Sequence, residues 1–164
     1  NIRKFPHYYH LASEPSSLPY NDVNCFAEDA KGNLWIGTNG GGLIYFDRLR
    51  GSYSTFRHQP ANQNSLSNDV VVSLFIDDEN LLWIGTYTGG LNCYDGKKFT
   101  RYQSSKDRFT GLPSNYIWSI TQDEEKRLWI GTLGEGIVLF DKRTGLFSEV
   151  PNSGTTTLPS KFVN

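Results

Sequence analysis

The chain has 164 residues and a formal net charge of −1 at pH 7, with 20% charged and 14% aromatic residues. This balance gives no electrostatic footprint for nucleic acid or for an anionic membrane surface. No apolar run reaches the length of a transmembrane helix, and no signal peptide pattern is present. The two cysteines, Cys25 and Cys93, have no metal or redox spacing, and we expect two buried free thiols.

One pentapeptide, Leu-Trp-Ile-Gly-Thr, occurs three times, at Leu34–Thr38, Leu82–Thr86 and Leu128–Thr132. The tryptophans of these copies lie 48 and 46 residues apart. A fixed period of this length is typical of a repeat architecture. A residue that recurs once per repeat therefore has a structural explanation first.

In chain order, the repeat pattern begins within one unit and ends within another. Residues 1–11 contain Phe5 and Tyr8, an apolar pair that also closes the later repeats, and we predict that they form the outer strand of a preceding blade. Three blades follow, at residues 18–58, 66–103 and 112–150, and residues 158–164 start the next one. Because the chain contains no Met, we interpret it as a piece of a longer protein.

Each repeat contains four short strand signals separated by turn signals. In the second repeat we predict strands at Val70–Ile76, Leu82–Thr86, Leu91–Tyr94 and Lys98–Gln103. Their residues are mostly β-branched or aromatic, and no stretch has a helical period. Four antiparallel strands in a repeat of about 45 residues form the blade of a β-propeller. We therefore predict an all-β propeller fold with about three and a half four-stranded antiparallel blades.

Blades of a propeller pack against each other on both faces, which explains the near-continuous apolar strands. The mid-strand glycine of each copy, such as Gly85, is expected to lie beneath a ring of the neighbouring blade. The innermost strands carry small residues at one shared position, namely Cys25, Ser73 and Ser119. If each of the two end blades left ~500 Å² of apolar surface exposed, roughly 12 kcal/mol of stabilisation per face would be lost at ~25 cal/mol per Å². We therefore expect closure by further sequence or by a second copy.

The short turns after the first and third strands of each blade carry aspartates in step with the repeat, such as Asp29, Asp77 and Asp123. Asx-type turns explain these positions. In the usual blade order, the second-to-third turns and the blade-to-blade connections lie on the opposite face, where the copies diverge. Loops on a rigid scaffold are where binding residues are usually found.

The complete pattern resembles the two-component regulator propeller repeat. The second copy carries the resemblance with Leu66-Ser67-Asn68-Asp69-Val70, followed by Leu-Trp-Ile-Gly-Thr, Gly89-Gly90-Leu91 and Tyr94-Asp95. The resemblance implies seven-bladed propellers, often in tandem, in the periplasmic sensor region of hybrid histidine kinases of Bacteroidetes. It also implies an oligosaccharide ligand, a neighbouring propeller or a second protomer in a homodimer, and an inner-membrane anchor supplied by segments outside this sequence.

A sugar site requires an aromatic plate for C–H faces and planar polar groups for hydroxyls. Six residues on the divergent face have suitable chemistry, and we predict them as ligand-binding candidates: Tyr87, Trp118, Asn39, Asn24, Arg108 and Glu135. For Trp118, packing in the core is the competing interpretation. We expect no cofactor, no metal site and no catalytic residue.

Two alternatives stay open at the level of sequence. A propeller enzyme, either a polysaccharide or streptogramin-type lyase or a glycosidase, needs carboxylates outside the repeat pattern, and a glycosidase needs two of them close together. Four candidates exist, but no pair stands out: Asp22, Asp69, Asp107 and Glu135. A protein-interaction scaffold would instead use exposed aromatic residues on the divergent face, such as Tyr87, Tyr116 and Trp118.

Overall fold

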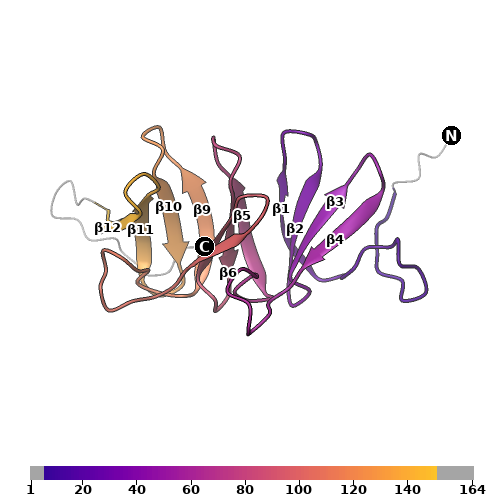
Figure 1. The fold of residues 1–164 in the computed structure, drawn as a ribbon, viewed down its shortest axis with the longest axis horizontal. Coiled ribbons are helices and arrows are strands. Elements are labelled where there is room, and N and C mark those ends of the chain that lie inside the picture. Colours follow the sequence, from indigo (N-terminus) through magenta and orange to yellow (C-terminus); the bar gives the residue numbers. More distant parts are fainter. Residues whose placement is uncertain (1–5, 151–164) are drawn as a thin grey trace.

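The computed structural model describes residues 6–150, which form three four-stranded antiparallel sheets. Figure 1 shows the sheets side by side, in chain order from one end of the molecule to the other. Blade 1 contains β1 (Val23–Glu28), β2 (Leu34–Thr38), β3 (Leu43–Asp47) and β4 (Ser52–Phe56). Blade 2 contains β5 (Val71–Ile76), β6 (Leu82–Thr86), β7 (Leu91–Tyr94) and β8 (Phe99–Tyr102). Blade 3 contains β9 (Ile117–Gln122), β10 (Leu128–Thr132), β11 (Gly136–Asp141) and β12 (Leu146–Glu149).

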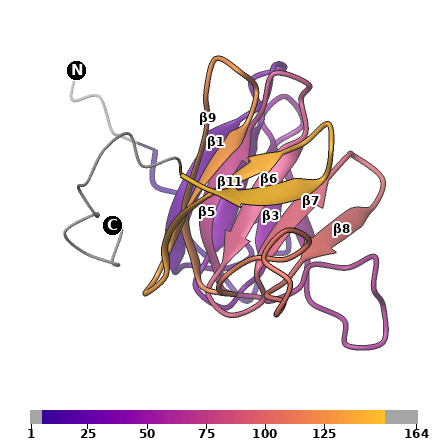
Figure 2. The same ribbon diagram turned by 90° about the vertical axis from the view of Figure 1, so that its left-hand side faces the viewer.

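Within each blade the strands pair in sequence order, from an inner to an outer strand. The inner strand β5 contacts the inner strand of each neighbouring blade, β1 and β9. In Figure 2 these three strands gather on one side of the molecule, and the outer strand β8 lies on the other. The predicted all-β propeller architecture with four-stranded antiparallel blades is confirmed.

In blade 2 the second and third strands have the predicted bounds, and the other two are shorter. Val70 lies outside β5 because its N–H donates to Asn68 Oδ1 at 2.8 Å, and it forms an isolated bridge with Asn39 of blade 1. Lys98 belongs to the turn before β8, where its N–H donates to Asp95 Oδ1 at 2.9 Å. Side-chain bonds to the backbone therefore set these strand ends.

Residues 6–11 contain no strand, so this part of the predicted outer strand is not formed, but Tyr8 packs on blade 1. The ring centroids of Tyr8 and Phe46 are 5.7 Å apart. The equivalent pairs between true blades are Phe56 with Tyr94, at 5.4 Å, and Tyr102 with Phe140, at 5.0 Å. The remaining part of the predicted preceding strand, residues 1–5, and the predicted start of another blade, residues 158–164, lie outside the described residues.

The mid-strand glycines lie beneath aliphatic side chains, so the expectation of a covering ring is wrong. A Cβ on Gly85 would collide with Ser73 Oγ of its own blade and with Ile117 of blade 3. A Cβ on Gly37 would meet the equivalent pair in the adjacent interface, Cys25 and Val71. Both Ile117 and Val71 are fully buried, so a branched side chain, rather than a ring, fills the space where inner strands converge.

Two matching aromatic triads hold the blades together farther from the inner strands. Between blades 1 and 2, Trp35 lies 5.6 Å from both Phe56 and Tyr94. Between blades 2 and 3, Trp83 lies 5.9 Å from Tyr102 and 5.6 Å from Phe140. Aromatic pairs at such separations add to the stabilisation from burial itself. The repeated tryptophan is therefore a packing residue, as its period predicts.

The two faces of the blades also follow the predicted arrangement. On one face, Arg48 N in the β3–β4 turn donates to Asn33 Oδ1 in the β1–β2 turn at 3.1 Å. On the other face, Gly42 N in the β2–β3 turn donates to Asp69 O in the connection to blade 2 at 2.9 Å. We call the first surface the Asp-turn face and the second the divergent face.

Candidate functional site

Two tyrosines from neighbouring blades form an aromatic corner on the divergent face. Tyr87 follows β6 of blade 2, and Tyr116 precedes β9 of blade 3. Their ring centroids are 5.4 Å apart and their planes stand at 87°. The side chains remain 42% and 41% exposed, so each ring leaves a large part of its surface open to solvent.

Backbone hydrogen bonds anchor the main chain at both tyrosines. Tyr87 N donates to Val70 O at 3.0 Å, and Tyr116 O accepts from Leu133 N at 3.0 Å. In blade 1 the equivalent bond runs from Asn39 N to Asp22 O at 2.8 Å. Because this bond recurs in every blade, the scaffold presents whatever side chain stands there in a constant place. The side chain at this position therefore differs between blades, whereas the backbone hydrogen bond is the same.

Trp118 lies two residues after Tyr116, at an irregular point of β9. Thr132 pairs with Ile117 and Gly131 pairs with Ser119, so Trp118 has no partner of its own in the ladder. A bulge of this kind re-aims a side chain. Trp118 is half-buried, so it is neither fully packed in the core nor free on the surface.

The two asparagine candidates lie in blade 1, and each already binds the protein. Asn39 Nδ2 donates to Asp22 Oδ2 at 2.9 Å. Asn24 Nδ2 donates to Val71 O of blade 2 at 2.9 Å, so this amide links two inner strands. Both residues are exposed, and each amide retains further hydrogen-bonding capacity.

Arg108 lies apart from the aromatic corner. Its guanidinium forms an ion pair with Glu149 on the outer strand β12 at 3.0 Å. The neighbouring Phe109 O accepts from Phe147 N at 2.9 Å, which places this loop along the outer edge of blade 3. The structure therefore does not bring Arg108 together with Tyr87.

Glu135 is exposed at the tip of the β10–β11 turn, between two glycines with positive φ. The equivalent positions in blades 1 and 2 are Gly41 and Gly89. Their backbones lie against Tyr20 and Ser67, which leave no room for a side chain. Blade 3 thus has an exposed carboxylate where blades 1 and 2 have a glycine without room for a side chain. The same blade contributes Tyr116.

The other acidic candidates serve the local structure. Asp69 pairs with Arg57 at 3.0 Å and also accepts from His58 N. Asp107 accepts from Phe109 N and from the hydroxyl of Thr110, and these bonds lower the pKa of its carboxyl. Within residues 6–150 there is no cluster of His, Cys, Asp or Glu that would suit a metal ion, and no helix is long and apolar enough to span a membrane.

Three structural features were missed by sequence reasoning. The indole N–H of Trp83 donates to Asp77 Oδ2 at 2.8 Å, which the constant spacing of six residues between them signals. Lys142 of blade 3 reaches Asp77 at 2.9 Å. The fully buried Asn92 accepts a bond from Ser67 N at its Oδ1, at 3.0 Å, and donates from its Nδ2 to Ser67 Oγ, at 2.7 Å. The signal for Asn92 was its departure from the apolar residue at this position in the other blades, Ile44 and Val138.

Comparison with known proteins agrees with the repeat pattern. The family model described as "Two component regulator propeller" matches residues 17–40, 65–88 and 111–134, once in each blade. The extracellular domain of the putative hybrid two component system BT3049 from B. thetaiotaomicron is similar in structure, with a TM-score of 0.77 and 27% identity. That match covers 94% of this chain and 21% of the other.

A second solved structure is similar in fold. The extracellular domain of the putative hybrid two component system BT4673 from B. thetaiotaomicron matches with a TM-score of 0.74 and 21% identity. The match covers 92% of this chain and 21% of the other. The chain thus spans about a fifth of the length of these structures. No curated protein sequence matches the chain significantly.

Proposed function

Because the chain carries three two component regulator propeller repeats, we propose that it is part of the ligand-sensing propeller of a hybrid two-component sensor. The proposed location is periplasmic, in the sensor region of an inner-membrane histidine kinase. The relative with 27% identity is an extracellular domain of such a system, which supports this location. No catalysis is assigned to these blades.

The proposed ligand is an oligosaccharide that binds at the corner of Tyr87 and Tyr116. The observation that carries this proposal is the exposure of two perpendicular rings on a face where backbone bonds anchor the main chain of both tyrosines. Apolar C–H faces of a sugar pack against such rings. Trp118 and Glu135, from the same blade as Tyr116, would supply further apolar contact and a hydroxyl acceptor.

Binding at this corner would couple two blades, because Tyr87 belongs to the turn of blade 2 and Tyr116 to the entry of blade 3. A ligand shifts a signalling equilibrium only by its difference in affinity between two states. We propose that those states differ in the arrangement of this propeller against a neighbouring propeller or a second protomer of a homodimer.

Calorimetric titration of the intact protein with a panel of oligosaccharides tests the function directly. Saturable binding of one member without turnover is the expected result. Formation of hydrolysis or elimination products would instead assign an enzyme. Absence of both binding and chemistry, together with a retained protein partner, would assign a scaffold.

A further inference from the structure

The aromatic corner belongs to a rim of the divergent face that backbone contacts carry from blade 1 to blade 3. Asn39 of blade 1 forms a bridge with Val70 of blade 2, and Tyr87 N donates to Val70 O at 3.0 Å. The ring of Tyr87 then meets that of Tyr116 in blade 3. Charged side chains along this rim therefore act on a ligand that binds at the corner.

One carboxylate lies at the blade 3 end of the rim. Leu133 N donates to Tyr116 O at 3.0 Å, and Glu135 follows two residues later, exposed at the tip of the same turn. A Cβ on Gly134 or Gly136 would meet no atom beyond its chain neighbours within 4 Å, so this turn stands clear of the surrounding structure. The Glu135 carboxylate is therefore accessible to a ligand beside Tyr116.

A second carboxylate lies at the blade 1 end of the rim. Asp22 is exposed, and its Oδ2 accepts from Asn39 Nδ2 at 2.9 Å. The ion pairs within residues 6–150 all involve carboxylates other than Asp22 and Glu135. Both ends of the rim thus carry a negative charge without a counter-ion from this part of the chain.

The basic residues of the divergent face do not offset these carboxylates. Within residues 6–150, the turns and connections of this face contain three of them, Arg57, Lys106 and Arg108. Arg57 pairs with Asp69 at 3.0 Å, so its charge is already balanced. The other two belong to the loop along the outer edge of blade 3. The inner and outer strands of a four-stranded blade lie about 14 Å apart, and salt screens charges beyond about 8 Å.

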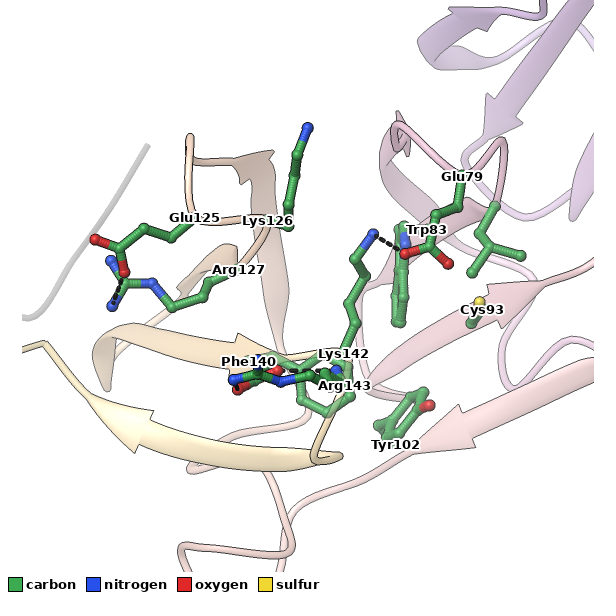
Figure 3. Close-up of a pocket in the computed structure, with 12 residues that line it drawn as sticks. Glu79, Trp83, Cys93, Tyr102, Glu125, Lys126, Arg127, Phe140, Lys142 and Arg143 are labelled. Atoms are coloured by element: carbon green, nitrogen blue, oxygen red, sulfur yellow. Dashed lines mark hydrogen bonds and ion pairs between the residues drawn. The ribbon is translucent and has the colours of Figure 1, made fainter.

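The other basic residues of blade 3 lie on the Asp-turn face. Figure 3 shows Lys126, Arg127, Lys142 and Arg143 on the turns of that face. Each pairs with a carboxylate there, at distances from 2.9 to 3.7 Å. A strand of five residues, such as β10, separates the two faces by about 17 Å. Within residues 6–150, the charges beside the corner are therefore negative.

Given the proposed function of this corner, on which the inference depends, we propose that it binds uncharged oligosaccharides and rejects those that carry carboxylate or sulfate groups. Glu135 is the main determinant, because its turn bonds Tyr116. The rings act in the same direction, since the faces of aromatic rings are electrically negative. An uncharged sugar donates hydroxyl hydrogens to the carboxylate, whereas an acidic sugar brings like charges together.

Calorimetric titration of the intact protein with matched pairs of oligosaccharides tests this selection. Each pair combines a neutral chain with an acidic one of the same length: mannan with mannuronan, xylan with methylglucuronoxylan, and galactan with sulfated galactan. In at least one pair, the neutral member should bind about tenfold or more tightly than the acidic member at low ionic strength. The gap in affinity should narrow as added salt screens the repulsion.

Glu135→Gln should narrow this gap by at least about threefold, because the acidic member no longer meets a like charge. The matched control is Glu124→Gln, which removes an exposed carboxylate from the Asp-turn face of the same blade and should leave the gap unchanged. An acidic member that binds as tightly as its neutral partner, or an unchanged gap in Glu135→Gln, would overturn the charge selection and leave the proposed function standing. Absence of binding to every member, neutral and acidic, would overturn the proposed function and the selection with it.

Discussion

Ser73 is a polar residue at a place that requires only small size. Its hydroxyl is buried and has no hydrogen-bond partner within residues 6–150. A buried hydroxyl without a partner costs about 1–3 kcal/mol of desolvation. Ser73→Ala should therefore raise the free energy of unfolding by about 1 kcal/mol, measured from the denaturant midpoint.

The matched control is Ser119→Ala at the equivalent position of β9. Only the Ser73 hydroxyl is both buried and without a partner within residues 6–150, so Ser119→Ala should change stability less. A loss of stability in Ser73→Ala equal to or larger than that in Ser119→Ala would contradict this account of the inner strand.

Lys142 is a buried cation that connects blade 3 to blade 2. Its side chain is 9% exposed, and that of its partner Asp77 is fully buried. Removal of one member of a buried ion pair leaves the other charge without its counter-ion, which costs about 3–5 kcal/mol. Lys142→Met should therefore destabilise the protein by about 3 kcal/mol in urea unfolding at pH 7. The neighbouring Arg143→Met, at an exposed side chain, should cost less than about 0.5 kcal/mol.

The cost of Lys142→Met should depend on pH. Burial opposes ionisation of Asp77, but bonds from Lys142, Trp83 and the backbone lower the pKa of its carboxyl overall. A lowered pKa contributes stability above the unfolded value of about 3.9, and that contribution is lost as the pH falls through the folded value. The difference between wild type and variant should shrink below about pH 4. A constant difference from pH 7 to pH 3 would show that the carboxylate is not the reason for it.

At the scale of strands and turns, the period of the tryptophan predicts most of the fold. Leu82–Thr86 and Leu91–Tyr94 have their predicted bounds because the two strands pair with each other, and the turns at Asp77 and Asp95 end the pair on one side. The covering of Gly85 was not predictable, because a glycine signals that a neighbour is close and does not say which one. Ile117, which covers it, lies in the next blade.

The candidate site was predictable only in part. Departure from the repeat identified Tyr87, and the structure adds Tyr116 as its perpendicular partner. Arg108 was grouped with Tyr87 because both occur in diverging segments. The course of a long connection depends on tertiary contacts such as the pair with Glu149, which no period in the sequence encodes.

Residues in step with the repeat should determine stability. Trp83 is almost fully buried, packs on two rings and bonds Asp77. Trp83→Ala should cost at least about 3–5 kcal/mol, enough to unfold a typical domain, as monitored by loss of the folded circular dichroism signal. If this variant kept the midpoint of the wild type, the triads would not be what holds blades 2 and 3 together.

In the whole molecule, the two faces of the blades differ in how closely their residues follow the repeat. The Asp-turn face repeats its aspartates and closes with short turns, and the divergent face changes its side chains on a constant backbone. Tyr87 and Tyr116 combine both properties: their backbone hydrogen bonds recur in every described blade, and their side chains differ from those at the equivalent positions.

The proposed role of this aromatic corner is to bind the ligand without stabilising the fold. The most direct measurement is calorimetry of the intact protein with the oligosaccharide that the panel identifies, using Tyr87→Ala, with Phe109→Ala on the outer loop as an exposed aromatic control. Tyr87→Ala should weaken binding by about tenfold or more and leave the unfolding midpoint nearly unchanged, and Phe109→Ala should change neither. Unchanged affinity in Tyr87→Ala, or a loss of stability as large as that of Trp83→Ala, would contradict this proposed role.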